Sequence, residues 1–312
     1  MNVYAIGMRT RFREITVREG ILLHGEAGWG EFCPFADYSD TESAPWLASA
    51  LEASERGWPS PVRDRVEINA TVPIVDPERA YELVKDSGCR TAKVKVADKR
   101  ATLAEDCARV EAVRDALGPS GAIRVDANAA WDVETALRAI ADLDKAAGGL
   151  EYVEQPCVTI EELAAVRRRA GVRIAADESI RRAEDPLKVA VAGAADIAVL
   201  KVAPLGGVRR ALEVAEACGL PCVVSSAVET SVGLAAGLAL AGALPELDYA
   251  CGLGTLSLLN EDVSTSSLSP VDGYLPVPAR APEPDLYGYV AADADTRARW
   301  LDRLSRVRAH LR

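Results

Sequence analysis

The chain has 312 residues, a net charge of −11 at neutral pH and hydrophobic residues at 49% of its positions. This composition is typical of a globular protein, and the negative charge argues against nucleic acid or an anionic membrane surface as a partner. No apolar run approaches the roughly 18 residues of a membrane span, and the first residues lack an apolar signal core. We therefore expect a cytoplasmic protein without a membrane segment.

Residues 1–64 show the pattern of a small α+β unit. Three segments alternate apolar and polar residues like an antiparallel meander with a glycine-rich turn, namely VYAIGMRTRF, REITVREGILLHG and GWGEFCPF. The segment SAPWLASALEASERG that follows predicts an amphipathic helix. We expect a domain boundary at residues 64 and 65.

Residues 65–256 alternate between apolar strands and helices. The predicted strands cover residues 66–72, 91–96, 122–128, 150–156, 173–179, 196–202, 221–229 and 249–255. Seven helical segments lie between them, and several begin at Asp, Thr or Ser or end in Gly, as helix caps prefer. The pattern predicts a (β/α)7β barrel. In the tail, residues 257–312, Trp300, Leu304, Val307 and Leu311 recur at helical spacing, so we expect a helix that packs on the body of the protein.

Charged side chains stand at the ends of five of these strands. Lys93 and Lys95 alternate with valines and therefore share one face of their strand, and Arg124, Asp126 and Asn128 do the same on the next strand. A charge in a strand that is buried on both faces is costly unless it is paired or binds something. The carboxyl ends of barrel strands meet at one mouth, so a single polar site accounts for all of these charges.

Three carboxylates come from successive strands, Asp126, Glu154 and Asp177. An isolated aspartate often caps the helix after a strand, but three in succession beside lysine strands favour a shared role. Hard oxygen ligands without any soft ligand suit Mg²⁺, with Mn²⁺ as the second choice. We therefore predict a metal site.

Lysines flank this metal site on both sides along the chain. Lys93 and Lys95 precede the acidic strands, and Lys201 follows them. A lysine that is partly desolvated among other cations has a lowered pKa and can act as a general base. A metal ion beside it favours removal of a proton next to a carboxylate, through an enediolate. The expected partner is thus a small-molecule carboxylate.

Other polar positions are candidates for substrate binding. Arg124 shares the face of Asp126 but lies one step deeper, where it either makes a structural ion pair or tunes the lysines. Ser225 and Ser226 end the seventh strand, and they either bind a substrate carboxylate or form a polar turn. Asn128 and Gly252, the latter in the predicted eighth strand, complete this set.

In these residues the chain resembles the enolase superfamily, muconate-lactonizing subgroup. The likeness runs from end to end, with K-x-K on the second strand, acidic residues on the third to fifth and a lysine on the sixth. It implies a modified TIM barrel, residues 65–256, under an α+β capping domain formed by residues 1–64 with a contribution from 257–312. In superfamily sites a Lys or His base works with Mg²⁺.

Within the subgroup, the likeness is greatest to enzymes that dehydrate 2-succinyl-6-hydroxy-2,4-cyclohexadiene-1-carboxylate in menaquinone synthesis. It rests on RTRFREITVREG, RVDANAAW, SSAVETSVG and GLGTLSLL. The resemblance implies that Lys95 acts as base and then as acid. It also implies that Lys201 stabilises the enediolate through a cation–π contact and that Lys93 helps to hold the carboxylate.

Besides this dehydration, two other functions stay open from the sequence. An N-succinylamino acid racemase or a dipeptide epimerase of the same subgroup uses two lysines on opposite faces of a carbon, and Lys95 and Lys201 would serve. Against an epimerase, the segment CGLGTL near the eighth strand lacks a D-x-D clamp. The second of these functions is that of a non-catalytic barrel that binds a carboxylated metabolite or a partner protein.

Overall fold

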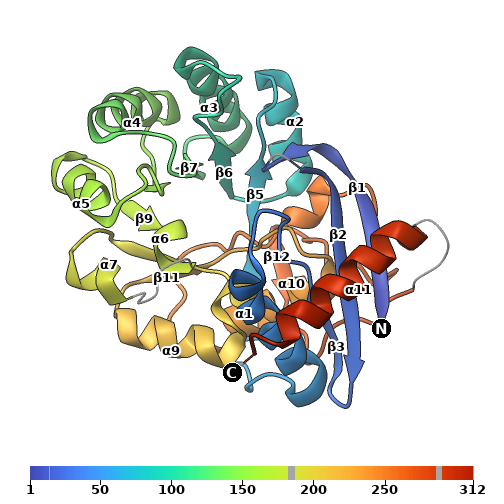
Figure 1. Cartoon of the computed structure of the whole chain (residues 1–312). Helices are drawn as coiled ribbons and strands as arrows, with labels where there is room; N and C mark the ends of the chain where they lie inside the picture. Colours follow the sequence, from blue (N-terminus) through green and yellow to red (C-terminus); the bar gives the residue numbers. More distant parts are fainter. Residues whose placement is uncertain (14, 182–186, 286–289, 312) are drawn as a thin grey trace.

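The computed structural model describes residues 1–13, 15–181, 187–285 and 290–311. The chain begins with a three-stranded antiparallel sheet in the order β1–β2–β3, followed by a helix (Figure 1). The bounds are Asn2–Phe12 for β1, Ile15–Gly25 for β2, Gly28–Phe32 for β3 and Asp40–Leu51 for α1. Ser39 caps α1, and a π-helical turn, Glu52–Arg56, extends it. The predicted meander and helix are confirmed.

The second sheet is parallel and curls into the barrel. In the described part of the chain it has seven strands in the order β11–β10–β9–β8–β7–β6–β5. Their bounds are Asn69–Val72 (β5), Thr91–Lys95 (β6), Ala122–Asp126 (β7), Tyr152–Glu154 (β8), Ile174–Ala176 (β9), Ile197–Leu200 (β10) and Cys222–Val224 (β11). Nearly all of these residues are buried, as expected for parallel strands covered by helices on one face and packed side chains on the other.

Helices follow the strands and surround the sheet (Figure 1). The longer ones are Pro77–Ser87 (α2), Leu103–Leu117 (α3), Val133–Ala147 (α4), Ile160–Arg169 (α5), Val208–Cys218 (α9) and Ser231–Ala243 (α10). Shorter ones are Glu178–Arg181 (α6), Leu187–Val191 (α7) and Val202–Leu205 (α8). The side chains of Asp76, Thr102, Asp132 and Thr159 cap α2 to α5 as predicted. The helical segment predicted between the fifth and sixth strands begins outside the described residues, and α7 is its described part.

The barrel closes differently from the prediction. No strand forms over residues 249–255 among the described residues, and closure instead depends on two isolated parallel bridges, Ile68 with Cys251 and Ser225 with Gly252. A Cβ atom at Gly252 would lie 2.7 Å from the Ser225 Oγ, so this position beside Ser225 has no room for a side chain. The first predicted strand also divides, because Arg65–Glu67 (β4) pairs antiparallel with Tyr274–Pro276 (β12) before β5 begins.

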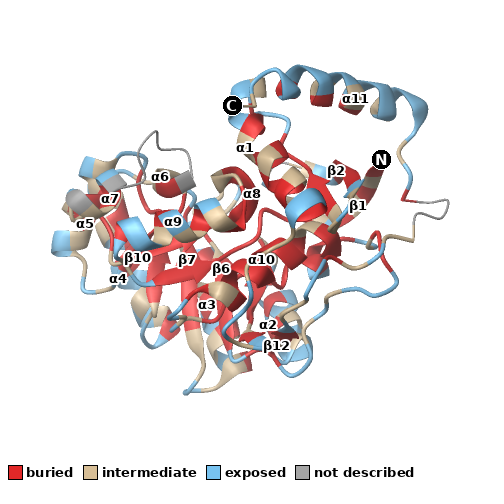
Figure 2. Ribbon diagram, turned by 90° about the horizontal axis from the view of Figure 1, so that it is seen from below, coloured by how far each residue is buried: buried red, intermediate tan, exposed pale blue. Residues whose placement is uncertain are grey.

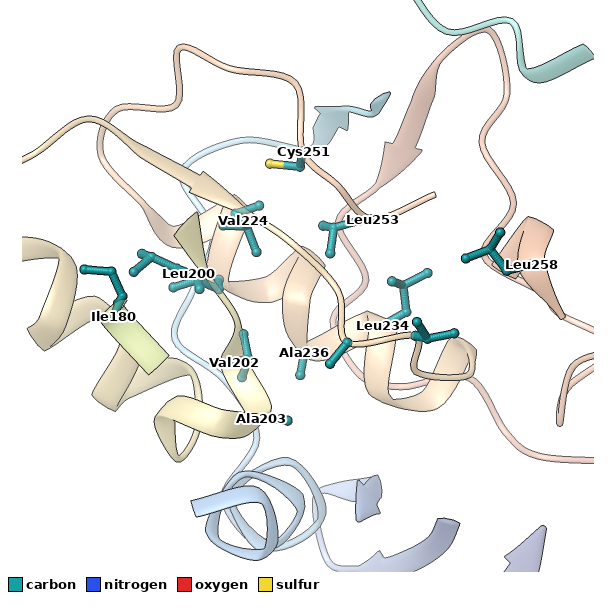
Figure 3. Packing of buried hydrophobic residues seen from close by; sticks show 14 of the residues in the cluster. Ile180, Leu200, Val202, Ala203, Val224, Leu234, Ala236, Cys251, Leu253 and Leu258 are labelled. Atoms are coloured by element: carbon teal, nitrogen blue, oxygen red, sulfur yellow. The ribbon is translucent and has the colours of Figure 1, made fainter. Parts of the chain in front are cut away.

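Helix α10 lies between the two units of the fold. It contacts β3 of the first sheet as well as β11 and α9 of the barrel. Its sequence is apolar around its whole circumference, which is the pattern of a helix buried on all sides. Figure 3 shows Leu234 and Ala236 of α10 packed near Val224 and Leu253, in the same cluster as Leu200.

The last helix, α11, spans Ala294–Arg308 and lies over the first sheet and α1 (Figures 1 and 2). Trp300, Leu304 and Val307 are buried, and the Trp300 ring meets the Phe32 ring at 6.0 Å in an edge-on arrangement. The prediction that this helix packs on the body is confirmed. The bounds of the capping unit, residues 1–64 with a contribution from 257–312, stay a prediction.

Gly30 provides a test of how the first sheet packs on α1. A Cβ atom at Gly30 would lie 2.0 Å from the Ala50 carbonyl oxygen. We expect Gly30→Ala to lower the free energy of unfolding by about 1–3 kcal/mol, because backbone must shift to relieve the clash. The measurement is urea unfolding. Gly171→Ala is the control, because no atom lies within 4 Å of its Cβ position, and it should not destabilise. Equal stability of both variants would contradict this packing.

Candidate active site

The register of the parallel strands places the charged residues side by side at the carboxyl ends of neighbouring strands. Lys95 on β6 pairs with Asp126 on β7, and Asp126 pairs with Glu154 on β8. Asp177 follows the last residue of β9, and Lys201 follows the last residue of β10. The five strand ends therefore form one continuous arc at the carboxyl edge of the sheet, as expected from the alternation of their side chains.

Lysines and carboxylates contact one another directly along this arc. The Lys93 Nζ lies 3.0 Å from the Glu154 Oε2 and 3.5 Å from the Asp126 Oδ2. The Lys95 Nζ lies 2.5 Å from the same Asp126 oxygen. On the other side, the Lys201 Nζ lies 2.5 Å from the Asp177 Oδ2. All three carboxylates are buried, so each depends on a cation for its charge.

Burial and the neighbouring charges shift the pKa values of Glu154, Lys95 and Lys93. Burial and the neighbouring Asp126 raise the pKa of Glu154 to about 7. Burial also lowers the pKa of Lys95, despite the opposing effect of Asp126. The pKa of Lys93 is raised, since its facing carboxylates outweigh the effect of burial. Lys95 is therefore the better suited of these two lysines to lose its proton.

The donor set fits a divalent cation by its chemistry. Asp126, Glu154 and Asp177 supply oxygen atoms from three neighbouring strands, and their mutual repulsion is what a cation would relieve. In the structure these oxygens contact the lysine ammonium groups. Among the described residues, no three acidic, histidine or cysteine side chains are arranged so that they could hold a metal ion together. A bound cation would replace lysine contacts at these oxygens.

A cavity of about 690 Å³ opens above the arc. Its lining contains seven of the residues predicted from the sequence, which are Lys93, Lys95, Asn128, Lys201, Ser225, Ser226 and Gly252. The three buried carboxylates are absent from this lining, whereas the lysines that contact them belong to it. The lysines are thus placed to contact a small molecule in the cavity.

Asn128 is held by its neighbours in a strained backbone conformation. Its φ angle is 46°, which is uncommon for a residue other than glycine. Its Oδ1 accepts a hydrogen bond of 2.7 Å from the Lys95 Nζ, and its backbone N–H donates to the Asp126 Oδ1 at 3.0 Å. Asn128 therefore positions the Lys95 ammonium group at the edge of the cavity.

Ser226 is held in place by hydrogen bonds of its hydroxyl group. The Ser226 hydroxyl donates to the Glu229 Oε2 at 2.6 Å and accepts from the Val228 N–H at 2.8 Å. It is thus part of the polar turn that the sequence left as an alternative. Both serines line the cavity, and a substrate-binding role for them stays a prediction.

The prediction that Arg124 binds substrate is not supported by its position. Arg124 is 0% exposed and does not line the cavity. Its guanidinium donates to the Glu151 Oε2 at 2.5 Å, the Ala250 carbonyl at 2.6 Å and the Asn69 Oδ1 at 3.1 Å. These contacts make Arg124 a structural ion pair inside the barrel, one layer below the site.

Sequence reasoning missed two groups of residues. Arg11, Phe12 and Arg13, at the tip of the β1–β2 hairpin, line the cavity, although only a tertiary contact brings them there. The second is Gln155, directly after Glu154. Its Oε1 accepts from the Asp177 N–H at 2.9 Å and its Nε2 donates to the Ser179 Oγ at 2.7 Å. Gln155 thereby orients the strand end at Asp177.

Fold and site together define a class of protein: a barrel enzyme with lysines on both sides of a buried carboxylate set. The description "Enolase C-terminal domain-like" matches residues 76–282, and "Enolase N-terminal domain-like" matches residues 3–54. No helix of the described residues is long and apolar enough to cross a membrane.

The chain is 67% identical to the o-succinylbenzoate synthase of Thermobifida fusca over 274 residues, 88% of this chain and 86% of the relative. Identity to the o-succinylbenzoate synthase of Mycolicibacterium smegmatis is 55% over 305 residues, 97% and 94% of the two chains. The chain therefore belongs to the enolase superfamily and, within it, to the o-succinylbenzoate synthases.

Solved structures agree on the fold. A dipeptide epimerase from Enterococcus faecalis V583 complexed with Mg and dipeptide L-Leu-L-Tyr has a TM-score of 0.73 at 23% identity, covering 90% of this chain and 99% of that one. A muconate lactonizing enzyme from Pseudomonas fluorescens complexed with muconolactone has a TM-score of 0.75 at 23% identity, covering 96% and 97%. These likenesses establish the modified barrel and its capping unit.

Arg124→Met tests the structural role of this arginine. We expect a loss of about 3 kcal/mol in the free energy of unfolding, because Glu151 and the Ala250 carbonyl lose a buried donor. The Michaelis constant of the folded variant should stay within about two-fold of wild type, a change too small for a lost ligand contact. Arg138→Met, at an exposed position of α4, is the control and should change neither quantity. A large rise in the Michaelis constant without loss of stability would restore the substrate-binding role.

Proposed function

We propose that this protein dehydrates 2-succinyl-6-hydroxy-2,4-cyclohexadiene-1-carboxylate to o-succinylbenzoate, a reaction of menaquinone synthesis. Membership of the o-succinylbenzoate synthases makes the protein a carbon–oxygen lyase. The observation that carries the assignment to this site is the placement of Lys95 and Lys201 at the two ends of the carboxylate arc, both lining one cavity. A ring held between them would present one face to each lysine.

Lys95 is the proposed base and acid. In its neutral form it takes the proton from the ring carbon that bears the carboxylate, and its lowered pKa makes that form more accessible near neutral pH. The electron pair of the broken C–H bond forms an enediolate. The ring C–O bond then breaks, the departing hydroxyl leaves as water with the proton returned by Lys95, and the ring becomes aromatic.

Lys201 and Lys93 supply fixed positive charge. Lys201 would face the opposite side of the ring, where its ammonium group stabilises the enediolate through a cation–π contact. Lys93 would help to hold the ring carboxylate. Asn128 keeps the Lys95 ammonium group in place, and Ser225, Ser226 and Gly252 would contact the substrate along the wall that they line.

The enzymes of this superfamily depend on a divalent metal, and we propose Mg²⁺ for this chain, with Mn²⁺ as a substitute. Asp126, Glu154 and Asp177 would hold the ion. Bound there, it would supply Lewis-acid stabilisation of the negative charge that develops on the substrate carboxylate. This role fits the raised pKa of Glu154, since the buried carboxylates carry more negative charge than they tolerate alone.

Metal dependence can be measured both by turnover and by stability. An exhaustively chelated sample should lose activity, and Mg²⁺ should restore it. Mg²⁺ should also raise the melting temperature of the wild type, since a ligand that binds only the folded state stabilises it. Asp177→Asn should abolish this rise. Asp98→Asn, at an acidic cavity position outside the proposed ligand set, should keep it. Full activity of a metal-free sample would refute the assignment.

Substitution of the lysines separates dehydration from racemisation. Lys95→Ala should eliminate turnover of either kind. Lys201→Arg keeps the positive charge but cannot act as a base, so some dehydration should remain. Exchange of the α-proton of N-succinylamino acids into deuterated water should disappear for one enantiomer. NMR follows both reactions, and Lys145→Arg on the exposed side of α4 is the control. Efficient racemisation without dehydration by the wild type would replace the proposed function with that of a racemase.

A further inference from the structure

Helix α3 carries a buried ion pair beside the end of β6. The Arg109 Nη1 lies 2.6 Å from the Asp106 Oδ1, and the two side chains are 3% and 2% exposed. Replacement of such a pair by apolar side chains of similar volume is often neutral for stability, because desolvation of the two charges offsets their attraction. Stability alone therefore does not account for this pair, and its remaining hydrogen bonds show what it holds in place.

These remaining hydrogen bonds go to the backbone of two loops at the carboxyl edge of the barrel. The Arg109 guanidinium donates to the Lys95 carbonyl at 3.2 Å and to the Val75 carbonyl at 2.7 Å. The Asp106 Oδ2 accepts from the Ala97 N–H at 2.8 Å. Lys95 is the last residue of β6, and Val75 lies between β5 and α2. The pair therefore holds the end of β6 at two points and ties it to the neighbouring loop.

The turn after β6 requires such support. Ala97 has a φ angle of 65°, a conformation that few non-glycine residues adopt and that persists only where surrounding contacts impose it. The hydrogen bond from its N–H to Asp106 is one such contact. Ala97 lines the cavity, and so does Ile74, the chain neighbour of Val75. The ion pair thus fixes two adjoining parts of the cavity wall from behind.

Lys95 is held at both ends of its side chain. Arg109 fixes its backbone carbonyl, while Asp126 and Asn128 contact its Nζ. A cation bound at Asp126 would replace one of the contacts at the Nζ. The position of the ammonium group would then depend more strongly on the backbone from which the flexible side chain extends. Displacement of a reacting group by about 1 Å can slow a reaction by about 100-fold.

We propose that Asp106 and Arg109 are positioning residues for the base: they fix the backbone at the end of β6 so that the Lys95 Nζ meets the substrate proton. The inference rests on the proposed function for the role of Lys95. It assigns to this pair an effect on turnover rather than on substrate affinity, since neither side chain lines the cavity.

Two substitutions of Arg109 test the proposal. Arg109→Met removes every donor to the two carbonyls. Arg109→Lys keeps a positive charge beside Asp106, but a single ammonium group cannot reproduce the planar fork that reaches both Val75 and Lys95. Steady-state kinetics of the dehydration in Mg²⁺ give kcat and KM for each variant, and thermal melting checks that each variant folds.

A matched control exists at the opposite end of the barrel. Arg167 on α5 pairs with Asp196 at 2.7 Å and donates to the Gly193 carbonyl at 3.2 Å. Asp196 also accepts from the N–H of Ile174, the first residue of β9, at 2.9 Å. This pair repeats the arrangement of an ion pair that grips backbone, but away from the catalytic edge. Arg167→Met is therefore the control for a purely structural loss.

We expect Arg109→Met to lower kcat at least about ten-fold through displacement of the base, with KM within about three-fold of wild type. Arg109→Lys should lie between wild type and Arg109→Met. Arg167→Met should lower the melting temperature but keep kcat within about two-fold of wild type. An unchanged kcat in Arg109→Met, an equal loss of kcat in Arg167→Met, or a change confined to KM would overturn the inference. If Arg109→Met does not fold, the kcat of Arg109→Lys decides.

A second measurement needs no turnover. A short pulse of acetic anhydride acetylates accessible amines, and mass spectrometry of the peptides gives the labelled fraction of Lys95, with Lys201 as the internal reference. In both Arg109 variants, labelling of Lys95 relative to Lys201 should rise at least about two-fold, because the strand end opens more often. It should stay at the wild-type value in Arg167→Met. Unchanged labelling in the Arg109 variants would overturn the inference, whereas a wild type that does not dehydrate the cyclohexadiene would refute the proposed function alone.

Discussion

The site depends on one constraint, the burial of three carboxylates at the ends of adjacent parallel strands. Such charges are tolerated only when cations lie against them. Lys93, Lys95 and Lys201 meet this need in the described structure, and the same cations line the cavity. Structural neutralisation and the proposed chemistry are therefore inseparable here. Lys95 illustrates this, because burial that destabilises its charge also suits it to accept a proton.

The capping unit has two roles that follow from its contacts. Its buried polar residues hold it on the barrel: Glu31 accepts hydrogen bonds from the Thr230 N–H and hydroxyl at the start of α10, and Arg18 donates to the Val228 carbonyl at 2.8 Å. Its hairpin tip provides one wall of the cavity. The contacts of Glu31 and Arg18 hold the sheet on the barrel, so the shape of the cavity wall that the hairpin tip forms depends on how the sheet docks.

Sequence patterns predicted the parts of the molecule that repeat. Each barrel strand is short, apolar and followed by a capped helix, and these local signals determined the positions of β6 to β11. The pattern was wrong where tertiary pairing overrides it. Residues 249–255 contribute only bridges at Cys251 and Gly252, because the space beside Ser225 admits no side chain. The first strand divides because β4 finds an antiparallel partner in β12, which is distant in sequence.

The sequence by itself predicted which charged residues meet at the strand ends, because a strand's two-residue period fixes which side chains share a face and parallel strands end at one edge. The structure brings together the residues predicted in this way, which are Lys93, Lys95, Asp126, Glu154, Asp177 and Lys201. Their catalytic and metal-binding roles stay a proposal. Only the tertiary structure decided that Arg124 is a buried ion pair and that Arg11, Phe12 and Arg13 reach the cavity. Depth within a barrel and docking of one unit on another depend on long-range packing, which local periodicity does not encode.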